Sequence, residues 1–224
     1  MYKMENILNA LKENAKPEKA EWTRKILTTK MPLLSVQMAD LKKIIKEIKK
    51  EDYIDYLESE TFKYYENTII YAKILSKLES FDDFKKYLLK LLPYVDNWST
   101  CDAIEVNFDK SEFENIFNLS KKLIKDAHEF TRRIGVRLLF KMLNYQEYTA
   151  KALAIVKELE NEKEYYVNMC IGWFLCEAFI KQRDYAILFI KEFENETAVR
   201  KTISKCRDSF RVSNEDKAFL KTLL

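Results

Sequence analysis

Glycine and proline are so rare in this chain that they narrow its fold class at once. Only two glycines (Gly135, Gly172) and three prolines (Pro17, Pro32, Pro93) occur among 224 residues. A sheet-rich fold needs many tight turns, and nucleotide-binding loops need several glycines in a short stretch. The sequence therefore predicts an all-helical protein and argues against the P-loop and Rossmann classes.

Apolar residues recur every three or four positions along the chain, for example in residues 7–11, 41–48 and 69–78. This spacing gives each helix one apolar face. Helix-start and helix-stop residues divide the chain into pieces of about 10–17 residues, the usual length of globular helices. We expect a single domain, residues 1–224, in which antiparallel helix pairs form a superhelical HEAT-like or armadillo-like stack. Such a stack has a concave face suited to a long ligand.

Both glycines fall inside predicted helices, where each costs about 1 kcal/mol relative to alanine. Close approach of a neighbouring helix is the expected reason for Gly135 and Gly172. The net charge is only +3, from 39 Lys and Arg against 36 Asp and Glu, so charge alone does not identify a nucleic-acid-binding protein. The basic runs at 41–50, 121–125, 131–137 and 199–207 are either solvated helix faces or a ligand surface.

The four cysteines stand singly and the chain has one histidine, His128, which we place on the surface near a helix start. This composition supports neither a zinc site nor a Cys/His nucleophile, so we expect no metal and no cofactor. The cysteines should be reduced, small, buried side chains; they are Cys101, Cys170, Cys176 and Cys206. With no signal-like N-terminus and no run of about 18 apolar residues, we expect a soluble cytoplasmic protein without membrane contact.

The stretch YVDNWSTCDAI carries a tryptophan and an aspartate four residues apart. On a helix, Trp98 and Asp102 would lie one above the other on the same face. Either the indole packs in the core and the carboxylate is merely solvated, or the pair holds a cationic group. Asp96 or Asn97 fits the N-cap of this helix, and we assign Trp22 to the core.

Four segments in order resemble the AlkD-like DNA alkylation repair proteins: residues 17–48, 97–104, 128–140 and 163–179. The last segment contains I-G-W-F-L-C-E, which is similar to the family pattern A-I-G-W-x-L-R-E. The resemblance implies a HEAT-like-repeat DNA glycosylase with a concave DNA-binding groove. Such an enzyme removes positively charged alkylpurines from duplex DNA, without a pocket for a flipped base. We expect it to act as a monomer.

The resemblance also implies roles for individual residues. The essential aspartate corresponds to Asp102, and the two sugar-contacting tryptophans correspond to Trp98 and Trp173. Arg133 would grip the DNA backbone from the rim of the groove, and Arg137 shares its helix face. The remaining expected DNA-binding residues are Lys141, Tyr165, Tyr166 and Gln37. Without the resemblance, Trp173 would be read as a core residue.

Four positions depart from the family pattern. Ser99 replaces an acid, Met169 and Cys176 replace basic residues, and Ile26 replaces an aromatic residue. Each lost phosphate contact would weaken duplex binding and reduce its salt slope by about 0.9. The sequence therefore leaves two functions open: a DNA-alkylpurine glycosylase, or a non-catalytic DNA-binding or protein-binding solenoid.

Overall fold

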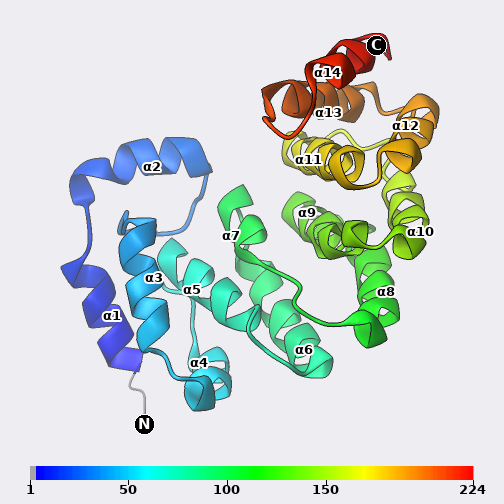
Figure 1. Ribbon diagram of the computed structural model, residues 1–224. Coiled ribbons are helices and arrows are strands. Elements are labelled where there is room, and N and C mark those ends of the chain that lie inside the picture. Colours follow the sequence, from blue (N-terminus) through cyan, green and yellow to red (C-terminus); the bar gives the residue numbers. More distant parts are fainter. Residues whose placement is uncertain (1–3, 224) are drawn as a thin grey trace. The chain divides into compact units, whose positions relative to one another are not determined.

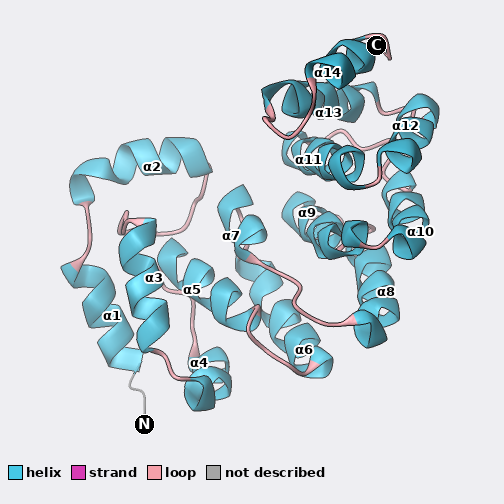
Figure 2. Ribbon diagram, viewed as in Figure 1, coloured by secondary structure: helices cyan, strands magenta, loops and turns pink. Residues whose placement is uncertain are grey.

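A computed structural model describes residues 4–223, and this part of the chain consists of helices and loops without a strand (Figures 1 and 2). This confirms the all-helical prediction. The contacts divide the chain into two compact units, one ending at Phe108 and one beginning at Asp109. The single stacked domain with a concave groove stays a prediction. No helix within residues 4–223 is long and apolar enough to cross a membrane.

The first unit is built around one buried helix, α5, which packs against α3, α4, α6 and α7. All residues of α5 are buried except Lys73. The α-helices of this unit are α1 (Met4–Glu13), α2 (Ala20–Leu27), α3 (Met38–Glu47), α4 (Tyr53–Ser59), α5 (Tyr65–Leu75), α6 (Phe81–Leu91) and α7 (Trp98–Ala103). Its 3-10 helices are η1 (Pro17–Lys19), η2 (Lys50–Asp52) and η3 (Leu92–Tyr94).

The second unit is centred on α11, which packs against α9, α12 and α13. Its α-helices are α8 (Phe113–Leu123), α9 (Glu129–Leu138), α10 (Gln146–Lys157), α11 (Tyr165–Lys181), α12 (Arg183–Glu192), α13 (Glu196–Asp208) and α14 (Asn214–Lys221). Two 3-10 helices, η4 (Lys110–Glu112) and η5 (Phe140–Asn144), connect them. Several helices, including the six-residue α7, are shorter than the predicted 10–17 residues.

The two glycines lie at close contacts with a neighbouring helix or the residue that follows one, as predicted. A Cβ atom added to Gly135 in α9 would lie 2.8 Å from Cγ2 of Ile124, just after α8. One added to Gly172 in α11 would lie 2.6 Å from Cβ of Lys201 in α13. Both contacts are far shorter than normal packing distances, so only glycine fits these helix crossings.

The predicted burial of the four cysteines is confirmed, and all are free thiols. The exposed position of His128 at the N-cap of α9 is also confirmed. The assignment of Trp22 to the core is wrong, because its side chain is 66% exposed. The reason is local: α2 is a short, charged helix that buries only Leu27.

Candidate catalytic centre and DNA-binding residues

Helix α7, which carries Trp98 and Asp102, begins at a well-formed cap. Asn97 is the N-cap, and its Oδ1 accepts a hydrogen bond of 2.9 Å from the Thr100 amide. The sequence predicted either Asp96 or Asn97 in this role. Asp96 fixes the loop after α2: its carboxylate accepts from Thr29 Oγ1 at 2.7 Å and from the Lys30 amide at 2.6 Å. Together these bonds set the position of α7 against the end of α2.

The next residues of α7 dock the helix on α5. The Tyr65 hydroxyl donates to Ser99 Oγ at 2.8 Å, and the hydroxyls of Thr68 and Thr100 lie 2.7 Å apart. Burial raises the pKa of Tyr65 to about 12, against the opposing effect of the Ser99 hydrogen bond. Ser99, which departs from the family pattern, therefore has a structural partner of its own.

Trp98 and Asp102 occupy the same face of α7, one helical turn apart, and both side chains are half-buried. The indole Nε1 of Trp98 donates a 3.2 Å hydrogen bond to the carbonyl oxygen of Ile26, at the end of α2. This bond fixes the ring's orientation. Trp98 is thus neither a fully buried core residue nor a freely rotating surface residue.

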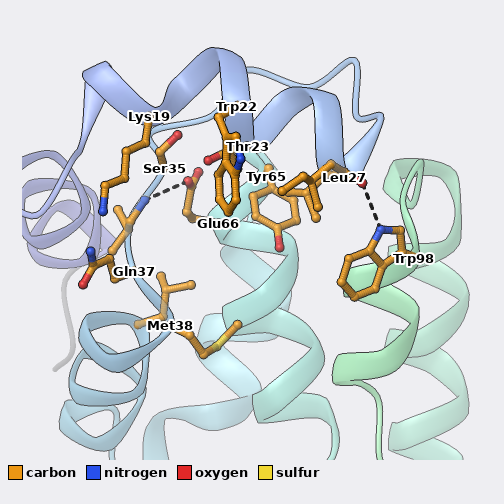
Figure 3. A pocket seen from close by; sticks show the side chains of 13 residues that line it. Lys19, Trp22, Thr23, Leu27, Ser35, Gln37, Met38, Tyr65, Glu66 and Trp98 are labelled. Atoms are coloured by element: carbon orange, nitrogen blue, oxygen red, sulfur yellow. Dashed lines mark hydrogen bonds between the residues drawn. The ribbon is translucent and has the colours of Figure 1, made fainter. Parts of the chain in front are cut away.

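Trp98 also forms one wall of a cavity of about 330 Å³ below α2, which we call the α2 cleft (Figure 3). Its other lining residues include Trp22, Ile26, Ser35, Gln37, Met38, Tyr65 and Glu66. The structure therefore brings together Gln37 and Trp98, two of the predicted site residues. The sequence did not point to Trp22 or Glu66 as lining residues. Glu66 carries no local signal, because it is an acid in the first turn of α5 and is followed by the polar Asn67 and Thr68.

Glu66 is fully buried at the base of the α2 cleft. Its Oε1 accepts hydrogen bonds from the amides of Leu34 at 3.0 Å and Val36 at 3.3 Å, so the carboxylate holds the loop before α3. Burial raises the pKa of Glu66, while these amides act in the opposite direction.

In the second unit, Arg133 is not on an exposed rim as the sequence predicts. Its side chain is 5% exposed, and Nη1 donates to the carbonyl oxygen of Tyr166 in α11. The reason is that Arg133 lies on the side of α9 that packs against α11. Its contact with a DNA phosphate stays a prediction.

Its neighbour Arg132 forms a buried ion pair. Nε and Nη2 of Arg132 donate to the two carboxylate oxygens of Glu162 at 2.6 and 3.1 Å, and both side chains are mostly buried. Burial alone would raise the pKa of Glu162, but the hydrogen bond from Arg132 and those from nearby amides lower it. This pair fixes the start of α9 to the loop before α11.

Trp173 is half-buried in α11 and one of its neighbours is a cation. The guanidinium carbon of Arg137 lies 4.8 Å from the indole ring and 4.6 Å from the ring of Phe140. Phe140 in turn meets Trp173 edge-on at 4.6 Å between ring centroids. Arg137, predicted to bind DNA, thus packs against two aromatic rings that also contact each other.

The other predicted DNA-binding residues of this unit differ in exposure. Tyr165 is 55% exposed at the start of α11, with its ring 5.2 Å from that of the half-buried Tyr166. The ammonium group of Lys201 lies 5.1 Å from the Tyr165 ring. Lys141 is half-buried in η5. Among the predicted residues Tyr165, Tyr166 and Lys141, Tyr165 is the exposed one, and their contact with DNA stays a prediction.

Neither of the two positions that lack the family's basic residue is fully exposed. Cys176 is 3% exposed and interacts with the thiol of Cys206, whereas Met169 is half-buried. Next to Cys176, the carboxylate of Glu177 forms a two-point ion pair with Arg211. A guanidinium therefore lies close to the position where the family has arginine.

The model of the family described as DNA alkylation repair enzyme matches residues 7–207. The chain belongs to this family. Membership of the DNA alkylation repair family implies interaction with DNA and a role in the repair of alkylation damage. A comparison with curated proteins found no match. Within residues 4–223, no three His, Cys, Asp or Glu side chains are arranged to hold a metal ion.

Each unit of this DNA alkylation repair protein thus carries part of the predicted site. The first contains Trp98, Asp102 and Gln37, and the second contains Trp173 and the basic residues. The meeting of Trp173 with Trp98 and Asp102 around one sugar stays a prediction.

Proposed function

We propose that the protein is a DNA glycosylase that hydrolyses the N-glycosidic bond of positively charged alkylpurines in duplex DNA. The observation that carries the proposal is the pair on α7: Trp98, oriented by its bond to Ile26, and Asp102 one turn away on the same half-exposed face. Two other residues of the helix, Ser99 and Thr100, bond to α5. An indole and a carboxylate on one face suit a group that becomes positively charged.

The reaction needs little acid assistance, because an alkylated purine already carries a positive charge and leaves as a neutral base. As the C1′–N bond breaks, its electron pair goes to the base and positive charge develops on the deoxyribose. The Asp102 carboxylate stabilises this charge and orients a water molecule. The water oxygen bonds to C1′ and its proton passes to Asp102 or solvent, leaving an abasic site and the free base.

The indole of Trp98 adds a cation–π interaction with the developing charge, about 0.5–2 kcal/mol depending on desolvation. We assign the same role to Trp173, and we assign to Arg137, beside its ring, a contact with a neighbouring phosphate. Lys141, Tyr165 and Tyr166 would bind the DNA backbone, in line with their family positions.

The burial of Arg133 favours the alternative, a non-catalytic DNA-binding or protein-binding member of the family. An arginine that bonds to the Tyr166 carbonyl must leave that partner to reach a phosphate. Met169 and Cys176 supply no charge in its place. This alternative predicts a salt-dependent shift of duplex DNA without base release.

The two functions are separated by measuring release of 3-methyladenine and 7-methylguanine from methylated duplex DNA under single-turnover conditions. We expect release by the wild type and a loss of at least about 100-fold in Asp102→Asn. Asp184→Asn is the matched control, because this carboxylate is 92% exposed and should leave the rate unchanged. No release by the wild type at saturating enzyme would reject the glycosylase, and DNA binding without release would establish the alternative.

A further inference from the structure

Helices α11 and α13 of the second unit lie side by side and run in the same direction (Figure 1). Near the start of both helices, Nδ2 of Asn195 donates to Oδ1 of Asn168 at 2.9 Å. Further along, a Cβ atom added to Gly172 would lie only 2.6 Å from Cβ of Lys201. Because the residue numbers rise together from one contact to the next, the two helices are parallel and closely packed at this level.

Each of these helices carries a buried cysteine one turn beyond the glycine contact. Gly172 also approaches the backbone nitrogen of Thr202, and four residues later the two helices reach Cys176 and Cys206. The Cys176 residue is 3% exposed and Cys206 is 0% exposed. The Cys206 thiol donates a hydrogen bond to the sulfur of Cys176. Two sulfur atoms in this contact need only a small approach to form a disulfide.

The other two cysteines make different contacts. Sγ of Cys170 donates to the carbonyl oxygen of Arg133 in α9 at 3.8 Å, so this thiol points to the helix on the other side of α11. Cys101 belongs to the first unit, and its Sγ donates to the carbonyl oxygen of Asn97 at 3.4 Å. These two buried thiols are therefore internal controls for the contact between Cys176 and Cys206.

The two thiols of the pair differ in acidity. The hydrogen bond from Cys206 lowers the pKa of the Cys176 thiol, while burial acts in the opposite direction. The Glu177 carboxylate raises this pKa, and the positive charges of Arg211 and Lys205 lower it. For Cys206, the same hydrogen bond and burial both raise the pKa. Since the thiolate is the nucleophile, Cys176 is the thiol that reacts first.

We propose that Cys176 and Cys206 form a redox site, which a peroxide converts reversibly to an intramolecular disulfide between α11 and α13. The Cys176 thiolate attacks one oxygen of hydrogen peroxide. The O–O bond breaks, the leaving hydroxide takes up a proton to give water, and Cys176 becomes a sulfenic acid. The Cys206 thiol then attacks this sulfur, so that the S–S bond forms and the S–O bond breaks. The oxygen leaves as a second water with the proton of Cys206.

The burial of the pair selects the oxidant by size. An opening that leaves Cys176 3% exposed admits a molecule as small as hydrogen peroxide. Cys206 needs no access of its own, because it reacts with a sulfur that it already contacts. A dithiol such as dithiothreitol reverses the step by thiol–disulfide exchange and becomes the oxidised, cyclic disulfide. Neither direction involves DNA, so the inference is independent of the proposed glycosylase.

The test treats the full-length reduced protein with hydrogen peroxide and then blocks the remaining thiols with iodoacetamide in denaturant. Intact mass and non-reducing peptide mapping locate the oxidised cysteines. We expect the loss of two hydrogen atoms and a peptide linked through Cys176 and Cys206, with Cys101 and Cys170 still alkylated. Dithiothreitol should restore all four alkylation sites. This arm uses the wild type alone and does not depend on the folding of any variant.

Three variants test the order of the steps. Cys206→Ser should lose the disulfide and stop at a sulfenic acid on Cys176, which dimedone traps. Cys176→Ser should lose both the disulfide and the dimedone adduct, because the acidic thiol is gone. Cys170→Ser is the matched control: this thiol is also buried in α11 but bonds to α9, so the variant should form the disulfide as the wild type does. A thermal melt of each variant confirms that it is folded.

Several results would overturn the proposal. They are four alkylated cysteines in the wild type after peroxide treatment, a disulfide through Cys101 or Cys170, and a crosslink between two molecules. A disulfide that persists in dithiothreitol would contradict its reversibility, and dimedone labelling of Cys206 in place of Cys176 would reject the assigned order. Base release from DNA is measured separately, so failure of the glycosylase leaves the redox site standing.

Discussion

The indole nitrogen of Trp98 donates a hydrogen bond to the carbonyl oxygen of Ile26 at 3.2 Å. This bond joins the proposed catalytic helix α7 to the end of α2, seventy-two residues away in sequence. It fixes the orientation of a ring that lines the α2 cleft and stands one helical turn from Asp102. We therefore expect that removing this hydrogen bond changes the stability of the fold and the rate of base release by different amounts.

Trp98→Phe removes the bond but keeps an aromatic ring. We expect the free energy of unfolding to fall by no more than about 1 kcal/mol, because the lost hydrogen bond is solvent-accessible. Base release should slow by about tenfold, since the weaker ring loses both orientation and cation–π strength. Urea unfolding and single-turnover release measure the two effects. Tyr94→Phe, at an exposed ring outside the site, should change neither.

Arg132→Ala should destabilise the protein by about 3 kcal/mol, because it leaves Glu162 buried without its partner. The matched control is Arg200→Ala. Arg200 pairs with Glu196 at 3.7 Å on an exposed surface, where a pair is worth less than about 1 kcal/mol. Urea unfolding of both variants gives the comparison, and similar losses would contradict a structural role for the Arg132 pair.

The same pair predicts how stability depends on pH. The pKa of Glu162 is lower in the folded protein than its ordinary value of 4.5. Its ionised form therefore stabilises the fold above about pH 4.5, and this contribution disappears as pH falls through the lower folded pKa. The unfolding free-energy difference between wild type and Glu162→Gln should be largest at neutral pH and should shrink towards pH 3. A free-energy difference that grows on acidification would contradict the lowered pKa of Glu162 in the folded protein.

Gly172→Ala should be more destabilising than Gly135→Ala. At Gly172 a new Cβ would meet Cβ of Lys201 at 2.6 Å and backbone atoms of α13 at 3.0 Å, so two helices would have to separate. At Gly135 the nearest atom is a side-chain methyl carbon of Ile124 at 2.8 Å, which can move more easily, and one backbone atom, the Ile124 nitrogen, lies at 3.0 Å where Gly172 has two. Overpacking of about 1–3 kcal/mol should exceed the roughly 1 kcal/mol gained in helix propensity. Thermal unfolding would test this order.

Lys141→Ala and Arg133→Ala should affect DNA binding differently. Loss of a phosphate contact at Lys141 should reduce the slope of log affinity against log salt by about 0.9 with little change in stability. Arg133→Ala should instead lower the melting temperature, because its buried guanidinium bonds to α11. Duplex binding at several salt concentrations and thermal melts separate the two. A change of about 0.9 in the slope for both variants would mean that Arg133 leaves its buried position when DNA binds.

Features that depend on local sequence were predictable. Scarce glycines and apolar periodicity gave the all-helical fold, and the cap at Asn97 and the close contacts at Gly135 and Gly172 follow from rules that concern one helix and its neighbour. Two residues differ from what the sequence predicted: Trp22, assigned to the core, is exposed, and Arg133, expected on the rim of the groove, is buried. Residue type sets a preference for burial, but the outcome depends on which helix packs on that side.

The α2 cleft was not predictable in the same way. It requires α2, the loop before α3, α5 and α7 to meet, and the contact between Ile26 and Trp98 spans most of the first unit. Glu66 gives no local sign, because an acid in the first turn of a helix is commonly a solvated partner of the helix dipole. Its buried carboxylate finds its partners in the loop before α3. No single-helix pattern identifies those partners.

Helix α7 keeps its structural contacts and its proposed catalytic residues at different positions, and this separation affects how the protein could evolve. Ser99 and Thr100 attach the helix to α5, while Trp98 and Asp102 face the proposed chemistry. A descendant that replaces Trp98 and Asp102 would lose the proposed activity but keep its fold. A descendant that replaces Ser99 and Thr100 would lose the attachment of α7 to α5 and, with it, the activity. Inactive relatives with an intact scaffold should therefore arise readily, and they would be told apart by those two outward positions.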